Sequence, residues 1–180
     1  TWKPITLHQV VTHTAGIPNF TSFPDYASTM MLKSPPAESL KKFRDKPLDF
    51  DPGTKFNYSN SGFVLLGYII ENVAGEPYED YLRKNILDPL GMKDTGYDHG
   101  ETVLPKRAAG YVKGKTLANA AIIDMSIPHA AGSLYSTTLD LMKWDAAQSA
   151  GKLLTPENYL RYYTPGKNDY AYGLNEKTKN

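Results

Sequence analysis

The 180-residue sequence predicts a mainly α-helical fold with small β hairpins. Three observations support this prediction. A long apolar run fills residues 63–70, capping patterns precede several amphipathic segments, and prolines stand where helices commonly begin. Stretches typical of β-strands are few and short. We expect residues 1–180 to form a single domain or a fragment of a domain.

The first quarter of the chain contains three predicted helices. Thr6 and Gln9 form a capping box, which starts a helix that we expect to stop near Gly16. A short helix is expected over residues 26–32. A further helix is expected over residues 37–43, where a serine-proline pair precedes it.

Residues 50–66 form the stretch around which the chain is organised. Pro52 and Gly53 predict a tight turn, and the polar-aromatic alternation of residues 55–58 favours a short extended segment. Ser59 or Asn60 is expected to cap the following helix with its side-chain oxygen. This segment is therefore expected to be held rigidly from both sides.

The helix after this cap is predicted to run to about Val73, just before Gly75. Apolar side chains cover almost its whole circumference, and a helix of this kind is normally buried. We therefore expect it to be the central, fully buried helix of the domain. The side chains that give this pattern are Phe63, Val64, Leu65, Leu66, Tyr68, Ile69, Ile70 and Val73.

Further elements follow in the middle of the chain. A helix beginning at Pro77 is expected to reach about Ile86, and Pro89 closes it. Residues 93–105 are interpreted as a loop. Residues 109–112 and 116–120 are expected to pair as a β hairpin.

The last part of the sequence predicts two more helices. Thr137 and Asp140 form a cap pattern for a helix that reaches about Ser149. After a turn, residues 156–163 form a short final helix. Residues 170–174 are interpreted as the start of a strand.

Composition and charge exclude several classes of function. Twenty basic and nineteen acidic residues give no basic surface for nucleic acid or an anionic membrane. The chain has no cysteine, so disulfides, thiolate metal ligands and a cysteine nucleophile are excluded. No apolar run reaches the length of a membrane span. No metal or other cofactor is expected.

Tyr58 and Asn60 are the candidate site residues. Two positions apart on extended chain, their side chains are expected to point the same way. A proton-transfer group then lies beside a hydrogen-bonding group at the start of a helix. The alternative reading is purely structural, with a buried tyrosine followed by a helix cap.

The residues around this pair resemble a known family. The pattern Pro-Gly-Thr-x-Phe-x-Tyr-Ser-Asn-x-Gly over residues 52–62, followed by Leu-Leu-Gly, resembles the second motif of the penicillin-recognising serine hydrolases. These are the class C β-lactamases, the D-alanyl-D-alanine carboxypeptidases and related esterases. Residues 5–18, 81–97 and 131–141 are similar to flanking blocks of that family, in the same order.

The resemblance implies a fold, a reaction and two residue roles. The chain would be the helical domain of the β-lactamase/transpeptidase-like fold, lacking most of the α/β sheet domain. The reaction would be acyl transfer through a serine ester, on a β-lactam, a D-Ala peptide or an ester. Tyr58 matches the tyrosine that moves protons in catalysis, and Asn60 matches the asparagine that binds the substrate amide.

The sequence departs from the family pattern at the nucleophile. In the family, a Ser-x-x-Lys motif lies upstream of the blocks seen here. This chain has Ser39 with Lys42 and Ser149 with Lys152, both on the wrong side of the 5–18 block. We interpret both as chance matches to a short pattern.

The third family motif is also missing. Residues 177–179 read Lys-Thr-Lys where the family has Lys-Thr-Gly or His-x-Gly. We therefore expect the chain to be an excised middle piece of a serine hydrolase that is inactive alone. The alternative is a non-catalytic helical binding module derived from that family.

The histidines are expected to be structural. His8 and His13 are five residues apart, so on one helix their directions differ by roughly 140°, which does not suit a shared metal ion. His13 is expected to be a hydrogen-bonded support beneath the site.

The resemblance also implies partners and a location. A small-molecule or peptidoglycan-peptide-like substrate is expected, together with the remainder of the hydrolase fold. It further implies an extracytoplasmic location in the cell envelope or outside the cell. The sequence does not choose between β-lactamase, peptidase and esterase, although Tyr-Ser-Asn favours the last two.

Overall fold

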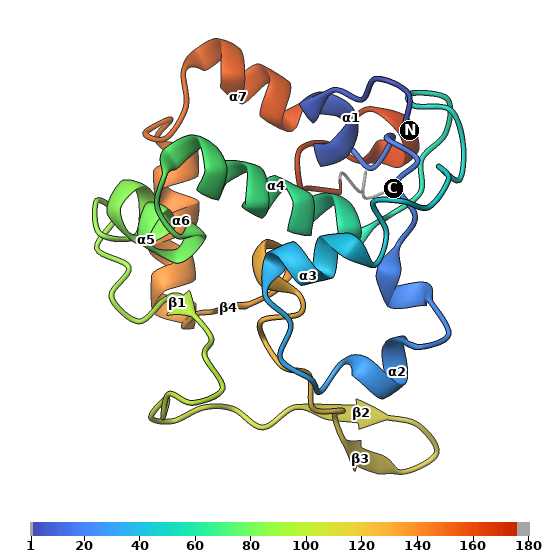
Figure 1. Ribbon diagram of the computed structural model, residues 1–180. Helices are drawn as coiled ribbons and strands as arrows, with labels where there is room; N and C mark the ends of the chain where they lie inside the picture. The colour runs from blue at the N-terminus through green and yellow to red at the C-terminus, as the bar shows by residue number, and fades with distance from the viewer. Residues whose placement is uncertain (1, 176–180) are drawn as a thin grey trace.

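The computed structural model describes residues 2–175 and shows a mainly helical chain with two small antiparallel sheets (Figure 1), which confirms the predicted fold class. The helices are α1 Leu7–Val11, α2 Tyr26–Thr29, α3 Pro36–Lys41, α4 Asn60–Ala74, α5 Tyr78–Leu82, α6 Thr138–Ser149 and α7 Pro156–Tyr163. The strands are β1 Gly96–Tyr97, β2 Tyr111–Lys113, β3 Leu117–Asn119 and β4 Leu134–Tyr135. Short 3-10 turns cover Phe20–Ser22, His129–Ala131 and Lys167–Asp169.

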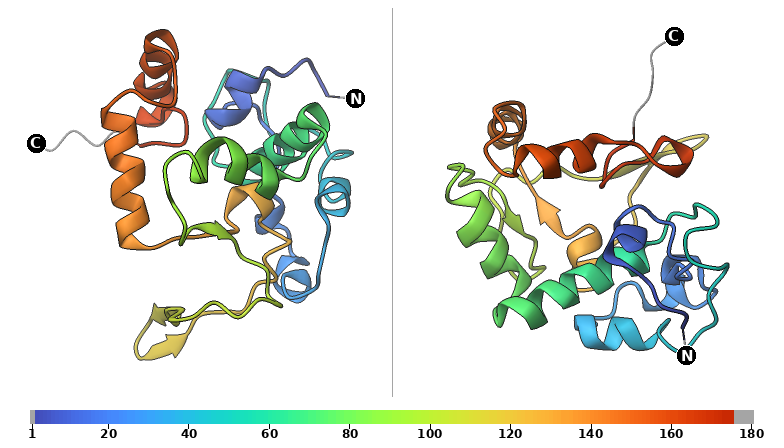
Figure 2. Two further views of the ribbon diagram at one scale, coloured as in Figure 1. Left: turned by 90° about the vertical axis from the view of Figure 1, so that its left-hand side faces the viewer. Right: turned by 90° about the horizontal axis from the view of Figure 1, so that it is seen from above.

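The longest helix, α4, crosses the middle of the molecule, with α1 and α3 beside its first half and α5 at its far end (Figures 1 and 2). The turn His129–Ala131 packs closely against it. This approach requires glycine at position 67, because a Cβ there would lie 2.5 Å from the Cβ of Ala130. The helix ends at Gly75, whose φ of 70° is left-handed, as the sequence predicts.

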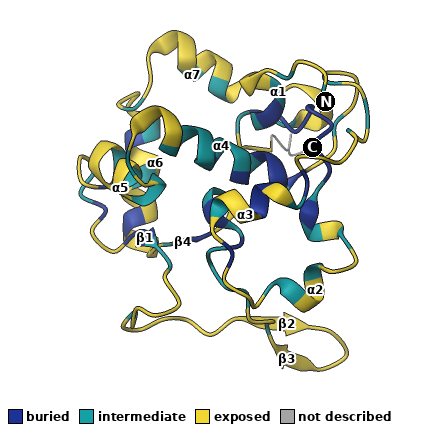
Figure 3. Cartoon of the chain, viewed as in Figure 1, coloured by how far each residue is buried: buried dark blue, intermediate teal, exposed yellow. Residues whose placement is uncertain are grey.

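The complete burial expected for α4 is wrong (Figure 3). Its buried residues are Ser61, Gly62, Val64 and Gly67, three of which have small or no side chains. The larger apolar residues are only partly buried, and Val73 is 83% exposed. The physical reason is that the described chain packs mainly against the helix before its last turns: Leu65, Leu66 and Tyr68 pack against the core cluster, whereas residues 72–74 are exposed.

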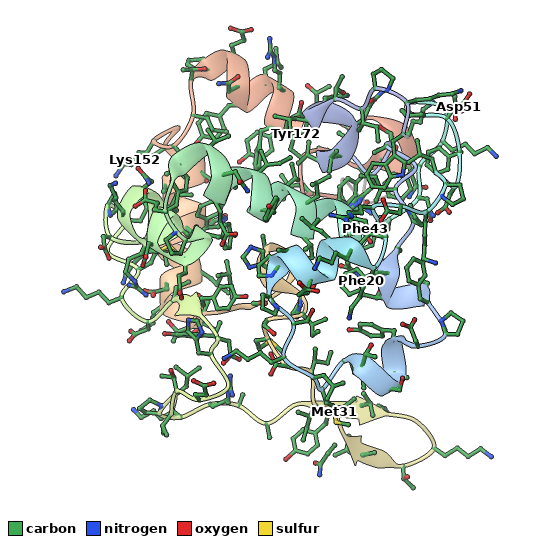
Figure 4. All side chains as sticks on the ribbon, in the orientation of Figure 1. Phe20, Met31, Phe43, Asp51, Lys152 and Tyr172 are labelled. Atoms are coloured by element: carbon green, nitrogen blue, oxygen red, sulfur yellow. The ribbon has the colours of Figure 1, made fainter. Side chains whose placement is uncertain are left out.

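The hydrophobic core lies between α1, α3 and the first half of α4. Phe20 and Phe43 are its largest members, and their stacked rings have centroids 6.2 Å apart (Figure 4). The remaining buried members are Val10, Ala15, Ile17, Leu40, Val64 and Ile127. Burying an apolar side chain of this size contributes about 1.5–3 kcal/mol, so this cluster fixes the start of α4 firmly.

Helix α1 has the predicted capping box but ends at Val11, earlier than the expected stop near Gly16. The reason is the backbone of His13, which has a φ of 55°. A left-handed residue interrupts helical geometry and turns the chain. The turn brings His13 beneath the segment that precedes α4.

The other elements largely follow the prediction. Helices α2 and α3 are shorter than expected by two or three residues at their C-terminal ends. Helix α5 continues as a π-helical turn over Arg83–Leu87, close to the predicted end at Ile86. Helices α6 and α7 have the predicted bounds, and the side chain of Thr137 caps α6 by accepting from the N–H of Asp140.

The two sheets differ in how well the sequence predicts them. Strands β2 and β3 form the expected hairpin, in which Val112 pairs with Ala118, and the hairpin extends away from the helices (Figure 2). Strands β1 and β4 pair Gly96 with Tyr135 and interrupt the expected 93–105 loop. This sheet was not predicted, because a two-residue strand is too short to show the alternation of polar and apolar residues from which strands are predicted.

The C-terminal part ends in an isolated bridge between Tyr170 and Asn175, where the start of a strand was predicted. The Lys-Thr-Lys segment at 177–179 lies outside the described residues. Within residues 2–175, no helix is both long and apolar enough to cross a membrane.

Candidate active site

Tyr58 lies on an extended segment between the turn at residues 51–54 and the start of α4. Its side chain is 50% exposed, so the structural reading of a buried tyrosine does not apply. Among the described residues, no hydrogen bond engages its phenol oxygen. The phenol is therefore available to a group that reaches it from solvent.

His13 supports the Tyr58 segment from below. Its carbonyl oxygen accepts the N–H of Asn57 at 2.9 Å, and its Nδ1 accepts the N–H of Ser59 at 3.1 Å. Its ring lies against the ring of Tyr58, with centroids 4.2 Å apart. One residue thus holds the backbone on both sides of Tyr58 and contacts its side chain, in agreement with the support role predicted for His13.

A third ring completes this cluster. Tyr170 lies 4.9 Å from His13 and 6.5 Å from Tyr58, measured between ring centroids, and its Oη lies 3.2 Å from Nε2 of His13. Burial raises the pKa of Tyr170, and the nearby phenol of Tyr58 raises it further. Burial lowers the pKa of His13 to about 4, because the charged imidazolium loses its hydration there.

Asn60 is the first residue of α4, and a separate hydrogen-bond network fixes it. Its backbone N–H donates to Oδ1 of Asn19 at 3.1 Å, and its Nδ2 donates to Oγ1 of Thr21 at 3.2 Å. The Thr21 hydroxyl in turn donates to the same Oδ1 of Asn19 at 3.0 Å. One N–H of the Asn60 amide is thereby bonded to Thr21, which fixes the orientation of the amide; among the described contacts its second N–H and its carbonyl oxygen make no hydrogen bond.

The predicted side-chain cap at the start of α4 is wrong. Ser59 occupies the N-cap position, but within residues 2–175 its buried hydroxyl makes no capping bond and has no hydrogen-bond partner. The oxygen that satisfies the first turn comes from Asn19, which is distant in sequence. Capping side chains usually come from the adjacent residue, so the sequence pattern pointed to the wrong oxygen.

The structure places the two candidate residues in neighbouring but separate networks. Tyr58 packs against His13 and Tyr170, whereas the Asn60 side chain is bonded to Thr21. Between the Tyr58 and Asn60 side chains themselves, the described contacts include none. A ligand that reaches both would have to bridge them.

The two Ser-x-x-Lys matches lie in settings unlike that of a nucleophile. Ser39 is fully buried, and its hydroxyl is bonded to that of Ser34 at 3.1 Å. The Nζ of Lys42 lies 6.0 Å from the centroid of the Phe20 ring. Ser149 is exposed at the end of α6, and Lys152 lies on the opposite side of the molecule from Asp51, which precedes the Tyr58 segment (Figure 4).

His8 and His13 contact different partners. Nδ1 of His8 is bonded to Oη of Tyr172 at 2.8 Å, near the surface. Within residues 2–175, no group of three histidine, aspartate or glutamate side chains is arranged to hold a metal ion. A hollow of about 710 Å³ lies between α1 and α7, with His8, Arg161 and Tyr172 on its walls.

Sequence reasoning missed three members of these networks. Asn19 and Thr21 gave no signal, because residues of mixed composition surround them. Tyr170 gave only the signal of a strand start. A search for polar residues that could reach the start of a helix from distant positions would have found Asn19 among many candidates. Such a search could not have distinguished Asn19 from the others.

The fold and the Tyr58–Asn60 segment together define the helical part of a β-lactamase-like protein. Comparison with known proteins gives the family. A family model described as Beta-lactamase matches residues 1–176. The chain belongs to the beta-lactamase family, as the resemblance in its motifs predicted.

Individual relatives agree with this assignment. PbpX of Bacillus subtilis (strain 168), named as a penicillin-binding protein, is 33% identical over 173 residues, which cover 96% of this chain and 42% of that protein. The serine beta-lactamase-like protein LACTB of Bos taurus, named as mitochondrial, is 35% identical over 168 residues, covering 78% of this chain and 30% of that protein. A D-stereospecific amidohydrolase from Streptomyces sp. superposes with a TM-score of 0.83 at 26% identity, covering 94% of this chain and 56% of its own. The chain therefore spans less than two thirds of each of these relatives.

Proposed function

We propose that this chain is part of a serine hydrolase that acts through an acyl-enzyme on amide or ester bonds. Tyr58 transfers protons and Asn60 binds the substrate. The observation that carries the proposal is a half-exposed phenol whose backbone is bonded on both sides, next to an amide whose orientation is fixed. The nucleophilic serine and its lysine come from polypeptide outside these 180 residues.

The reaction assigns a distinct step to each residue. The lysine takes up the proton of the serine hydroxyl, and the serine oxygen bonds to the substrate carbonyl carbon; the bond from that carbon to the leaving nitrogen or oxygen then breaks. Tyr58 relays this proton from the lysine to the leaving group, and water later hydrolyses the serine ester. The carbonyl oxygen of Asn60 accepts an N–H of the substrate, in an orientation that the bond from its Nδ2 to Thr21 fixes.

The substrate class that we favour is an amide or ester of the D-amino-acid or peptidoglycan-peptide type, or a related small ester. The Tyr-Ser-Asn motif supports the peptidase and esterase branches over the β-lactamases. The name of the Streptomyces relative, a D-stereospecific amidohydrolase, supports the amide reading. The near balance of charge gives no support for a polyanionic substrate.

We also propose that the whole protein works outside the cytoplasm, where peptidoglycan peptides occur. The support is the resemblance to D-alanyl-D-alanine carboxypeptidases and the relative named as a penicillin-binding protein. The mitochondrial relative marks the alternative location. Cell fractionation with an antibody against this chain distinguishes the two.

The alternative function is a non-catalytic helical binding module derived from the same family. It is favoured by one observation, namely that neither Ser-x-x-Lys match within the chain has a usable serine-lysine pair. The reading frame upstream discriminates between the two functions. A Ser-x-x-Lys motif there supports the enzyme, and its absence from the whole gene supports the binding module.

Covalent labelling tests the proposal directly. The 180-residue chain and the protein encoded by its complete reading frame are each incubated with a fluorophosphonate and a fluorescent penicillin. We expect a stoichiometric adduct only in the complete protein, on a serine upstream of residue 1. An adduct on Ser39 or Ser149 of the short chain, or none in the complete protein, contradicts the proposal.

A further inference from the structure

His13 is almost fully buried, yet its polar atoms are all engaged, and two of the bonds go to the residues that flank Tyr58. In an extended segment, the N–H groups of Asn57 and Ser59 point to the same side. Both end on His13, one on its carbonyl oxygen and the other on its ring. The segment belongs to neither sheet of the described residues. His13 therefore provides the hydrogen bonds that a neighbouring strand would provide in a sheet.

The bond from Ser59 determines where the imidazole proton lies. A backbone N–H can only donate, so Nδ1 of His13 must carry a lone pair. A neutral ring then has its proton on Nε2, which donates to Oη of Tyr170. The Ser59 N–H therefore selects the Nε2–H tautomer, and Oη of Tyr170 stabilises it by accepting the Nε2 proton.

The ring also limits the movement of the phenol. Tyr58 lies over His13 at a centroid distance of 4.2 Å, while Phe63 and Phe56 lie at 5.0 Å and 5.9 Å from the same ring. Helix α4 fixes the chain immediately after Ser59. A change in the tautomer or in the position of His13 would thus shift the backbone and the ring of Tyr58 together.

We infer that His13 is the positioning residue for Tyr58, and that Tyr170 keeps it in the Nε2–H tautomer required for that role. The inference rests on the proposed function, since it takes Tyr58 to be the proton-transfer group. His13 itself is buried and does not touch substrate. Its effect is on the rate of the chemical step, because misplacement of a catalytic group by about 1 Å can cost on the order of 10²-fold in rate.

The tautomer is tested in the wild-type protein, without any substitution. Long-range ¹H–¹⁵N correlation spectra of the ¹⁵N-histidine-labelled complete protein distinguish the two tautomers, and His13→Asn assigns the signal. We expect a single Nε2–H form at pH 7, and a mixture of tautomers in Tyr170→Phe. An Nδ1–H form in the wild type overturns the inference, as does an unchanged tautomer in Tyr170→Phe.

The positioning role is tested by kinetics in the same protein. His13→Ala removes both the acceptor and the ring, and we expect kcat to fall about 10²-fold with KM changed less than threefold. His13→Asn restores an acceptor for the Ser59 N–H, so part of the loss in kcat should be recovered. Amide exchange at Ser59 should slow again in that variant.

The chain offers a matched control in its other histidine-tyrosine pair. His8 and Tyr172 are bonded at 2.8 Å but do not touch the Tyr58 segment, so His8→Asn and Tyr172→Phe should leave kcat unchanged. An unchanged kcat in His13→Ala, or no recovery in His13→Asn, removes the positioning role. Normal turnover in Tyr58→Phe would instead refute the role of Tyr58, while the tautomer result would stand on its own.

Discussion

Oδ1 of Asn19 accepts the backbone N–H of Asn60 at 3.1 Å, so a residue 41 positions earlier in the chain caps the central helix. The same oxygen accepts the hydroxyl of Thr21, which orients the Asn60 amide. One loop side chain thereby links the stability of α4 to the geometry of the proposed substrate-binding group.

Replacing Asn19 with alanine should therefore affect both properties. We expect the free energy of unfolding to fall by about 1 kcal/mol from the lost cap. In the complete protein, KM should rise because Asn60 loses its alignment. Urea unfolding and steady-state kinetics measure the two effects. Asn72→Ala at the exposed end of α4 is the control, and an equal loss of stability there would show that Asn19 has no capping role.

Replacing Tyr58 with phenylalanine should slow acylation without loss of structure. The phenol oxygen makes no hydrogen bond among the described contacts, so its removal leaves no buried group unpaired. General acid-base groups contribute roughly 10²–10⁴-fold, and we expect a decrease in acylation rate of that order. Labelling rate and circular dichroism give the two readouts. Tyr111→Phe on the exposed hairpin should behave as wild type, and a normal rate in Tyr58→Phe would exclude Tyr58 from the mechanism.

The burial of His13 predicts a pH dependence of stability. Unfolded His13 takes up a proton below about pH 6.5, whereas folded His13 does so only near its lowered pKa of about 4. The unfolded state binds more protons in this window, so the stability present at pH 7 decreases as the pH falls toward 4. The full difference corresponds to roughly 3 kcal/mol. The groups that face the His13 ring are the phenols of Tyr58 and Tyr170. Burial also lowers the pKa of His129, so His129 contributes to the pH dependence with the same sign.

Two measurements check this pH dependence. Urea unfolding at several pH values between 7 and 4.5 should give a decreasing free energy, with a smaller slope in His13→Asn. Asp124 and Asp140 have lowered carboxyl pKa values, so they contribute mainly below this range. An NMR titration of the His13 ring with a midpoint near 6.5 would contradict the prediction.

Gly67→Ala should destabilise the fold even though alanine is the better helix former. The gain in helix propensity is about 1 kcal/mol. The added methyl group would lie 2.5 Å from Ala130 and 2.8 Å from His129, and overpacking of this kind costs roughly 1–3 kcal/mol. We expect a net loss in thermal unfolding experiments. Gly100→Ala meets no atom within 4 Å and is the matched control; stabilisation by Gly67→Ala would show that α4 does not approach residues 129–131 so closely.

The sequence predicted those features that depend on local patterns. The capping box at Thr6, the cap at Thr137 and the glycine at position 75 each act within a few residues, and the structure has all three. The features that it missed depend on contacts between distant segments. Asn19 reaches α4 across 41 residues, and Tyr170 reaches His13 across 157 residues.

The burial of α4 also depends on contacts between distant segments, which the local sequence pattern does not contain. Its apolar pattern correctly predicted a long helix, but a pattern does not state which segments will cover each face. The closest approaches to the helix are at Gly62, beside Val10, and at Gly67, beside His129 and Ala130, roughly 140° apart on its circumference. Larger side chains on the other faces stay partly open to water.

Those open side chains have a practical consequence for anyone who purifies these 180 residues by themselves. Ile69 and Ile70 are only partly buried, and Val73, near the end of the helix, is 83% exposed. Exposed apolar side chains of this kind bind hydrophobic dyes, detergent and other copies of the chain. The yield and the monodispersity of the purified chain should therefore improve in mild detergent or at low protein concentration. Replacing Val73 with lysine is the simplest remedy, because this side chain contributes little to the interior.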